Sequence, residues 1–203
     1  MSAASAIALI DYGAGNLTSV RKALAALGAD VLVPAQPADL ADARGVIVPG
    51  VGHFGATARL QGAWTDAILA RVGEGRPLLG ICLGMQWLYE SSDEAPDVPG
   101  LGLFSGNCYK LRADAVKVPH VGWNDLHIDH PSSILDGVAD RSQVYFTHSY
   151  VAPATNDTAA TTDHGARFAA VVQRGHVAGV QFHPEKSGEV GLQILRNFLA
   201  MAG

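Results

Sequence analysis

A cysteine stands where the sequence sets up a sharp turn between a buried strand and a helix. Cys82 lies in Gly80-Ile81-Cys82-Leu83-Gly84, directly after the apolar run Pro77-Leu78-Leu79. This is the strand–turn–helix layout of a nucleophile elbow, with a thiol where many hydrolases carry a serine hydroxyl. The flanking glycines leave room for a strained backbone, and the start of a helix favours thiolate. We therefore expect a nucleophile at Cys82, with a buried structural cysteine as the alternative.

A base and an acid that suit this thiol stand near the other end of the chain. Residues 176–182 alternate in the manner of a strand, and His183-Pro184-Glu185 follows directly. Proline favours an extended path at His183, and residues two apart in an extended chain face the same side. We expect Glu185 to orient the His183 ring, which completes a triad of thiol, base and acid. The alternative is an ordinary turn with a solvated glutamate.

A loop with two glycines offers backbone donors for a developing oxyanion. The strand at 46–48 runs into Pro49-Gly50-Val51-Gly52. Such a loop can turn a backbone N–H toward the reacting oxygen, and the N–H of Leu83 in the elbow can point the same way. A plain glycine turn would explain the loop equally well when it is considered alone.

The elements around these groups indicate an α/β fold with a mixed, mostly parallel central sheet. In the first half, expected strands at 7–10, 31–33, 46–48 and 78–81 alternate with helices at 17–27, 63–72 and 83–89. This order predicts a sheet covered by helices on both faces, with the site at the carboxyl ends of its strands. On the helices, we expect inner faces that comprise Leu17, Val20, Leu24 and Leu27; Trp64, Ile68 and Leu69; and Leu192, Leu195 and Leu199.

The second half reads as short strands followed by one helix. We expect strands at 103–111, 122–128, 144–150, 159–162, 169–173 and 176–182, an irregular loop at 93–100 and a helix at 188–201. The length of 203 residues suits one sizeable domain, which we assign to 1–203. An apolar content of 48% is enough for a buried core.

Composition excludes several classes of protein. The net charge of −5, without a basic run, argues against nucleic acid as a main partner. No window approaches the roughly twenty apolar residues of a membrane span, and the N-terminal stretch lacks the charged region of a signal peptide. Two cysteines, Cys82 and Cys108, fit a reducing compartment, and we expect a cytoplasmic protein without metal or cofactor. Buried packing is the default expectation for Cys108.

With these residues in place, the chain resembles the class I, or triad, glutamine amidotransferases, nearly end to end. The elbow and the His-Pro-Glu segment are shared by that whole family. Other motifs point to a branch whose members feed a partner cyclase. The motifs, in chain order, are Asp11-Tyr12-Gly13-Ala14-Gly15-Asn16, Pro49-Gly50-Val51-Gly52, Gly80 to Gln86, Pro119-His120-Val121-Gly122-Trp123-Asn124, Tyr145 to Tyr150 and His183-Pro184-Glu185-Lys186-Ser187.

The resemblance implies a flavodoxin-like fold and a reaction. Cys82 would attack the side-chain amide of L-glutamine, His183 would pass the proton to leaving ammonia and then activate water, and Glu185 would orient His183. The oxyanion would be held by the backbone of Leu83 in the elbow and of Val51 and Gly52 in the glycine loop, and the resemblance implies that this loop reorients before it donates. The implied substrate-binding residues are Gly50, Gly52, Gln86, Glu94, Thr147, His148, Ser149 and Tyr150, although surface polarity would also explain Gln86 and Glu94.

The resemblance also implies a partner, a cyclase subunit with a (β/α)8 barrel fold that receives the ammonia as half of a heterodimer. Residues expected on the docking face or signal path are Asn16, His120, Trp123, Tyr145 and Lys186. Core packing is the alternative for Trp123 and Tyr145, and a solvated side chain for Lys186. Two other interpretations stay open: another enzyme on the same scaffold, either an amidotransferase that feeds a different acceptor or a γ-glutamyl hydrolase, and a catalytically silent docking homologue.

Overall fold

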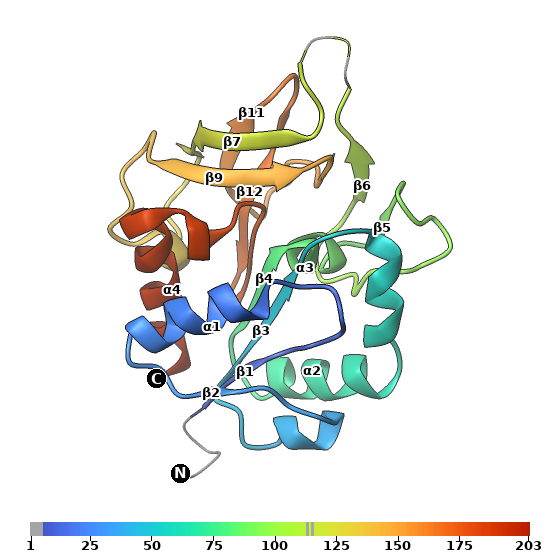
Figure 1. Cartoon of the computed structure of the whole chain (residues 1–203), viewed down its shortest axis with the longest axis vertical. Helices are drawn as coiled ribbons and strands as arrows, with labels where there is room; N and C mark the ends of the chain where they lie inside the picture. Colours follow the sequence, from blue (N-terminus) through green and yellow to red (C-terminus); the bar gives the residue numbers. More distant parts are fainter. Residues whose placement is uncertain (1–5, 113, 115) are drawn as a thin grey trace.

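A sheet of eight strands forms the centre of the computed structural model, which describes residues 6–112, 114 and 116–203 (Figure 1). Its strand order is β2-β1-β3-β4-β13-β12-β11-β8. The first five strands are parallel and the last three antiparallel, which confirms the predicted mixed, mostly parallel sheet. The strands are β1 (Ile7–Leu9), β2 (Val31–Leu32), β3 (Gly45–Gly50), β4 (Leu78–Cys82), β8 (His127–Ile128), β11 (Thr158–Asp163), β12 (Arg167–Arg174) and β13 (Val177–Val180).

Helices cover both faces of this sheet, because successive residues of a buried strand point to opposite sides. In β3, Ile47 packs into the apolar cluster of one face, whereas Val46 and Val48 pack into the cluster of the other. The first cluster includes residues of helices α1 (Leu17–Ala26) and α4 (Gly188–Ala202), and the second includes residues of α2 (Ala63–Gly73) and α3 (Leu83–Trp87).

Two smaller sheets lie beyond the carboxyl ends of the parallel strands (Figure 1). One is an antiparallel ribbon of β7 (His120–Asp125) and β9 (Gln143–His148), and the other has the order β10-β6-β5. These two small sheets therefore lie next to the loops that follow the parallel strands. The remaining elements are β5 (Ser91–Ser92), β6 (Asn107–Lys110), β10 (Tyr150–Val151) and the 3-10 turns η2 (Pro37–Leu40), η3 (Phe54–Leu60), η4 (Ser133–Leu135) and η5 (Pro184–Lys186).

Three expected strands are shorter or divided. The segment 122–128 contributes to β7 and β8, and 144–150 contributes to β9 and β10, so each serves two different sheets. Apolar alternation shows which side a residue faces, but it does not show which strand takes its hydrogen bonds. The segment 103–111 forms a strand only at β6, because Gly106 before it takes a φ of 120°, outside the range of a regular strand.

The predicted helix faces are partly correct. In α1, Val20 and Leu24 are buried as expected. In α2, Ile68 is buried but Leu69 is 37% exposed, so its placement on the inner face is wrong. A helix turns by about 100° per residue, so an error of one position moves a side chain off the face. In α4, Leu192 and Leu199 are half-buried at the margin, and the buried stripe is Gly191, Ile194, Leu195, Phe198 and Ala202.

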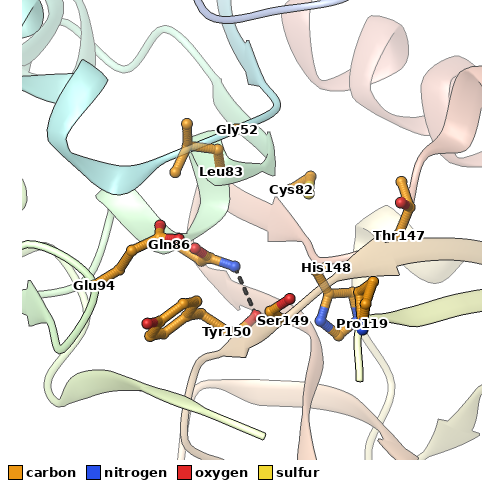
Figure 2. Close-up of a pocket in the computed structure, with 10 residues that line it drawn as sticks. All are labelled: Gly52, Cys82, Leu83, Gln86, Glu94, Pro119, Thr147, His148, Ser149 and Tyr150. Carbon is orange, nitrogen blue, oxygen red and sulfur yellow. Dashed lines mark hydrogen bonds between the residues drawn. The ribbon is translucent and has the colours of Figure 1, made fainter. Parts of the chain in front are cut away.

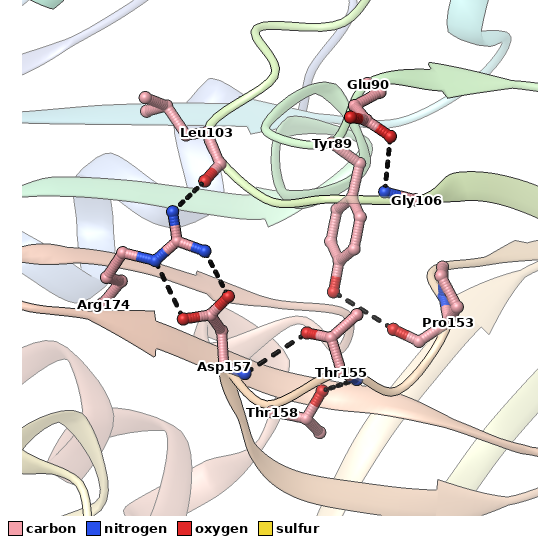
Figure 3. A network of polar contacts seen from close by, with 9 residues as sticks. All are labelled: Tyr89, Glu90, Leu103, Gly106, Pro153, Thr155, Asp157, Thr158 and Arg174. Carbon is pink, nitrogen blue, oxygen red and sulfur yellow. Dashed lines mark hydrogen bonds and ion pairs between the residues drawn. The ribbon is translucent and has the colours of Figure 1, made fainter.

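A polar network ties the segment after α3 to the 153–157 loop and to the end of β12 (Figure 3). Arg174 at the end of β12 pairs with Asp157 through two hydrogen bonds and donates a third, of 3.0 Å, to the Leu103 carbonyl oxygen. The Tyr89 hydroxyl donates to the Pro153 carbonyl oxygen at 3.4 Å. These contacts hold together three segments that are distant in sequence.

The described residues contain no helix of sufficient length and apolar character to span a membrane. The segment weighed as a signal peptide begins with residues 1–5, which lie outside the part of the chain that the structure describes.

The crossing of α4 over η5 gives a test of the packing. A Cβ at Gly191 would lie 1.9 Å from the Pro184 carbonyl oxygen, and this backbone cannot yield without moving the turn that carries Glu185. We expect Gly191→Ala to lower the free energy of unfolding by about 1–3 kcal/mol or more, measured by urea denaturation. Gly73→Ala is the matched control, because its Cβ meets nothing within 4 Å. Equal stability of Gly191→Ala and the wild type would contradict this account.

Candidate active site

Cys82 sits at a strained turn between β4 and α3. Its φ of 53° and ψ of −107° are rare for a residue with a side chain. The turn is also tight, since a Cβ at Gly80 would lie 2.6 Å from the Gly84 carbonyl oxygen. A Cβ at Gly84 would lie 1.8 Å from the Val48 carbonyl oxygen. The two glycines are therefore required by the close approach of backbone around the nucleophile, as the sequence predicts.

The pairing of β4 with β13 brings the two halves of the predicted triad to one edge of the sheet. Ile81 pairs with Val180, so Cys82 and the segment after β13 leave the sheet side by side. His183 Nδ1 and Glu185 Oε1 are 2.9 Å apart, and both side chains are buried. His183 is extended as expected, with a φ of −101° and a ψ of 98°, but the extended path does not continue to Glu185, because residues 184–186 form the 3-10 turn η5. The turn nevertheless folds the carboxylate back onto the ring.

The surroundings of His183 favour its charged form. Burial alone would lower the pKa of His183, but the neighbouring Cys82 sulfur and the Glu185 carboxylate raise it to about 10. Because Glu185 occupies Nδ1, the nitrogen left to exchange a proton with Cys82 is Nε2. Nε2 is buried and makes no hydrogen bond with any described residue in this conformation. Contacts of this kind often tighten only when a substrate is bound.

Gln181 is a site residue that the sequence analysis missed. It is fully buried, and its Nε2 donates to Cys82 Sγ at 3.6 Å. Its Oε1 accepts from Gln86 Nε2 at 3.1 Å, and the same Gln86 nitrogen donates to the Tyr150 carbonyl oxygen at 2.8 Å. Gln181 therefore links the Cys82 sulfur to Gln86 through a chain of hydrogen bonds. The available signal was one polar residue at the end of an apolar strand, two positions before His183.

The glycine loop after β3 holds its central N–H away from the nucleophile. The Val51 N–H donates to the Ala14 carbonyl oxygen at 3.2 Å. An oxyanion role for Val51 therefore requires its peptide to turn, which matches the expectation of a loop that reorients. Gly52, with a φ of 101°, and Leu83, at the start of α3, both line the pocket beside Cys82.

A pocket of about 190 Å³ opens beside the thiol (Figure 2). The Gln86 amide and the Glu94 carboxylate enter it from α3 and the loop that follows, opposite the end of β9 (Figure 2). Glu94 Oε2 accepts from the Phe54 N–H at 2.6 Å, which fixes the carboxylate in the wall. Gly50 is outside the lining, since it lies against the Tyr12 hydroxyl. The lining comprises Gly52, Cys82, Leu83, Gln86, Glu94, Pro119, Thr147, His148, Ser149 and Tyr150.

Neither cysteine is in a disulfide, and the two thiols have different surroundings. Cys108 is fully buried, and its Sγ lies 3.7 Å from the Gln86 carbonyl oxygen. Burial raises the pKa of the Cys108 thiol, so this residue acts as packing behind Gln86, as expected. No three His, Cys, Asp or Glu side chains among the described residues are placed to hold a metal ion.

Four of the five residues expected to serve the partner have some surface exposure. Trp123 is 55% exposed on β7, and its ring meets Tyr145 of β9 edge-on at 6.1 Å, so burial in the core is excluded for Trp123. The Lys186 amino group lies 5.8 Å from the Tyr145 ring centre, and Asn16 caps α1. His120 is buried in a stack with aromatic neighbours and cannot be a direct docking contact in this conformation.

Comparisons with protein families, with curated sequences and with solved structures all find glutamine amidotransferases or their HisH members. The family model "Glutamine amidotransferase class-I" matches residues 8–202. Imidazole glycerol phosphate synthase subunit HisH of Natronomonas pharaonis is 47% identical, over 95% of this chain and 93% of that protein. The HisH subunit of Gloeobacter violaceus is 49% identical, over 97% of this chain and 89% of that protein. A crystal structure described as a glutamine amidotransferase has a TM-score of 0.76 at 22% identity, covering 97% and 98% of the two chains, and supports the fold.

The raised pKa of His183 can be tested by removing its carboxylate partner. We expect Glu185→Gln to lower the pKa of His183 from about 10, because the amide carries no charge to balance the imidazolium. NMR titration of the imidazole signals measures this pKa. Glu189→Gln is the control, since Glu189 lies exposed in the first turn of α4. An unchanged His183 pKa in Glu185→Gln would contradict the assignment.

The loss of stability caused by Glu185→Gln should depend on pH in a predictable direction. A histidine whose pKa is raised by folding stabilises the fold fully below its unfolded pKa of 6.5, and this contribution is lost as the pH rises toward about 10. The difference in unfolding free energy between the wild type and Glu185→Gln should therefore narrow across that window. A difference that widens with rising pH would have the wrong sign.

Proposed function

The chain belongs to the class I glutamine amidotransferases, and we propose that it is the glutaminase subunit of an imidazole glycerol phosphate synthase. The observation that carries the proposal is the meeting of Cys82, His183 and Glu185 at one edge of the sheet, beside a small polar pocket. The names of the relatives, which align over nearly the whole chain, specify the branch of the family.

The geometry supports hydrolysis of L-glutamine to L-glutamate and ammonia in two steps. The Cys82 sulfur attacks the side-chain amide carbon, the C–N bond breaks, and His183 Nε2 gives its proton to the leaving ammonia. A γ-glutamyl thioester remains on Cys82. Water then attacks the thioester carbon as His183 takes a proton from it, and glutamate leaves as the sulfur is released as thiolate. Glu185 holds the ring in the orientation that both proton transfers need.

Substrate glutamine would lie along the pocket, with its amide at Cys82 and its α-carbon end away from the thiol. Gln86 is held by Tyr150 and Gln181, so its polar group has a fixed direction. The Glu94 carboxylate offers charge for the α-ammonium group, and the backbone at 147–150 faces the α-carboxylate. A charged pair at one end of the pocket would set the distance from the amide to the sulfur.

The partner is a cyclase subunit with a (β/α)8 barrel fold, in a heterodimer. It would receive ammonia without release into bulk water, where ammonia protonates, and would form imidazole glycerol phosphate and aminoimidazole carboxamide ribotide for histidine biosynthesis. The docking face would include Trp123, Tyr145 and Lys186, which share the β7–β9 ribbon and the turn beside it. As a member of this pathway, the complex would work in the cytoplasm.

Glutamine hydrolysis should depend on Cys82, whereas synthesis from added ammonium salts should not. We expect Cys82→Ala to abolish imidazole glycerol phosphate formation with glutamine, because no nucleophile remains, and to leave ammonium-dependent formation by the complex intact. Cys108→Ala is the control for loss of a thiol, and it should keep glutamine-dependent activity. Equal loss of both activities in Cys82→Ala would show that Cys82 is structural.

Partner-dependent activation is the second test of the proposed function. Because the Val51 N–H is bonded to Ala14, the isolated chain lacks one oxyanion donor. One such donor is worth about 10²–10³ in rate, so we expect glutaminase turnover to rise by that order when the cyclase binds with its nucleotide ligand. Full glutaminase turnover by the isolated chain would refute this gating.

A further inference from the structure

A buried tyrosine hydroxyl lies unused beside the glycine loop. The Tyr12 ring is almost fully buried, and its hydroxyl makes no hydrogen bond with any described residue. Leaving a buried hydroxyl unpaired is unfavourable, and such groups in native proteins call for a reason. The catalytic steps described above do not involve Tyr12.

The position of this hydroxyl connects it to the loop that must turn. A Cβ built on Gly50 would lie 2.0 Å from the Tyr12 phenolic oxygen, so the hydroxyl lies directly against the Gly50 backbone. The same Cβ would be 2.9 Å from the Leu83 Cβ, which leaves no space for a side chain between them. Because residue 50 is a glycine, the peptide that links Gly50 and Val51 can lie close to the unpaired Tyr12 hydroxyl.

Turning that peptide creates a need for a donor at this place. In a trans peptide the N–H and the carbonyl point in opposite directions. The Val51 N–H now points to the Ala14 carbonyl oxygen, so the Gly50 carbonyl oxygen points away from Ala14. Turning the peptide by about 180° frees the N–H for an oxyanion, but it leaves two carbonyl oxygens, of Gly50 and Ala14, facing each other. Two acceptors without a proton between them repel.

We infer that the Tyr12 hydroxyl is a positioning residue, which donates a hydrogen bond to the Gly50 carbonyl oxygen in the turned state and thereby stabilises the assembled oxyanion hole. This step rests on the proposed function. Tyr12 belongs to the same 11–16 loop as Ala14, so one short segment supplies the acceptor of the resting state and the donor of the active state. Burial, with a smaller effect of Cys82, raises the pKa of Tyr12, so the hydroxyl keeps the proton it donates.

The test is Tyr12→Phe in the complex with the cyclase and its nucleotide ligand. Phenylalanine keeps the packing and removes only the donor, so we expect glutaminase kcat to fall about tenfold with KM for glutamine unchanged. Alkylation of Cys82 by iodoacetamide and ammonium-dependent synthesis should be unchanged, because neither uses an oxyanion hole in this chain. The melting temperature of the isolated chain should stay level or rise, because an unpaired buried hydroxyl is removed.

Tyr89→Phe is the matched control, since Tyr89 is also buried but its hydroxyl donates to Pro153, away from the loop (Figure 3). It should leave glutaminase kcat unchanged. The inference is overturned if Tyr12→Phe turns over glutamine as fast as the wild type, or if it loses thiol reactivity and thermal stability together with kcat. A wild-type complex without any glutaminase activity would instead refute the proposed function, so the two failures are distinguishable.

Discussion

The parallel pairing of β4 with β13 is the constraint on which the site depends. These strands are about a hundred residues apart in sequence, yet their register sets Ile81 beside Val180. The chain then turns sharply at Cys82 on one strand and enters η5 on the other. Because both strands run in the same direction, thiol and imidazole emerge at the same edge. A slip of one residue would turn the side chains of β13 to the opposite face and separate Cys82 from His183.

The segment after β13 is held by an internal hydrogen bond, by β9 and by α4, which explains how a short turn can fix the positions of His183 and Glu185. Ser187 Oγ donates to the His183 carbonyl oxygen at 2.7 Å and accepts from the Tyr145 N–H at 2.9 Å. The His183 N–H donates to the Tyr145 carbonyl oxygen, and Gly191 lets α4 press on Pro184. The turn is therefore joined to β9, whose far end lines the pocket. If His183 and Glu185 act as proposed, this backbone network preorganises them as much as their own side-chain contact does.

The elements of the parallel half were predictable because each has a local signal. An apolar run predicts β4, and Gly80 and Gly84 indicate the sharp turn at Cys82. The second half was less predictable, because the partners of β8 and β10 are chosen by contacts that are distant in sequence. The contact of Glu185 with His183 was predicted from an extended chain, whereas the chain forms a 3-10 turn there. The prediction of the contact still holds, because both conformations bring the two side chains together. Gln181 was missed because one glutamine in a strand has no spacing pattern of its own.

The conformation of the glycine loop could not be read from the sequence, and the reason is physical. The two orientations of the peptide between Gly50 and Val51 use the same residues and differ only in which hydrogen bonds are made. In the structure the triad acid and base are in contact while the Val51 N–H is held by Ala14. His183 and Glu185 are thus already in contact in a conformation in which the Val51 N–H still points away from Cys82. The exposed Trp123 pairs across the β7–β9 ribbon with Tyr145, and Tyr145 bonds to His183 and Ser187. The β7–β9 ribbon therefore connects an exposed aromatic side chain to the backbone that holds His183, and the far end of β9 lines the pocket.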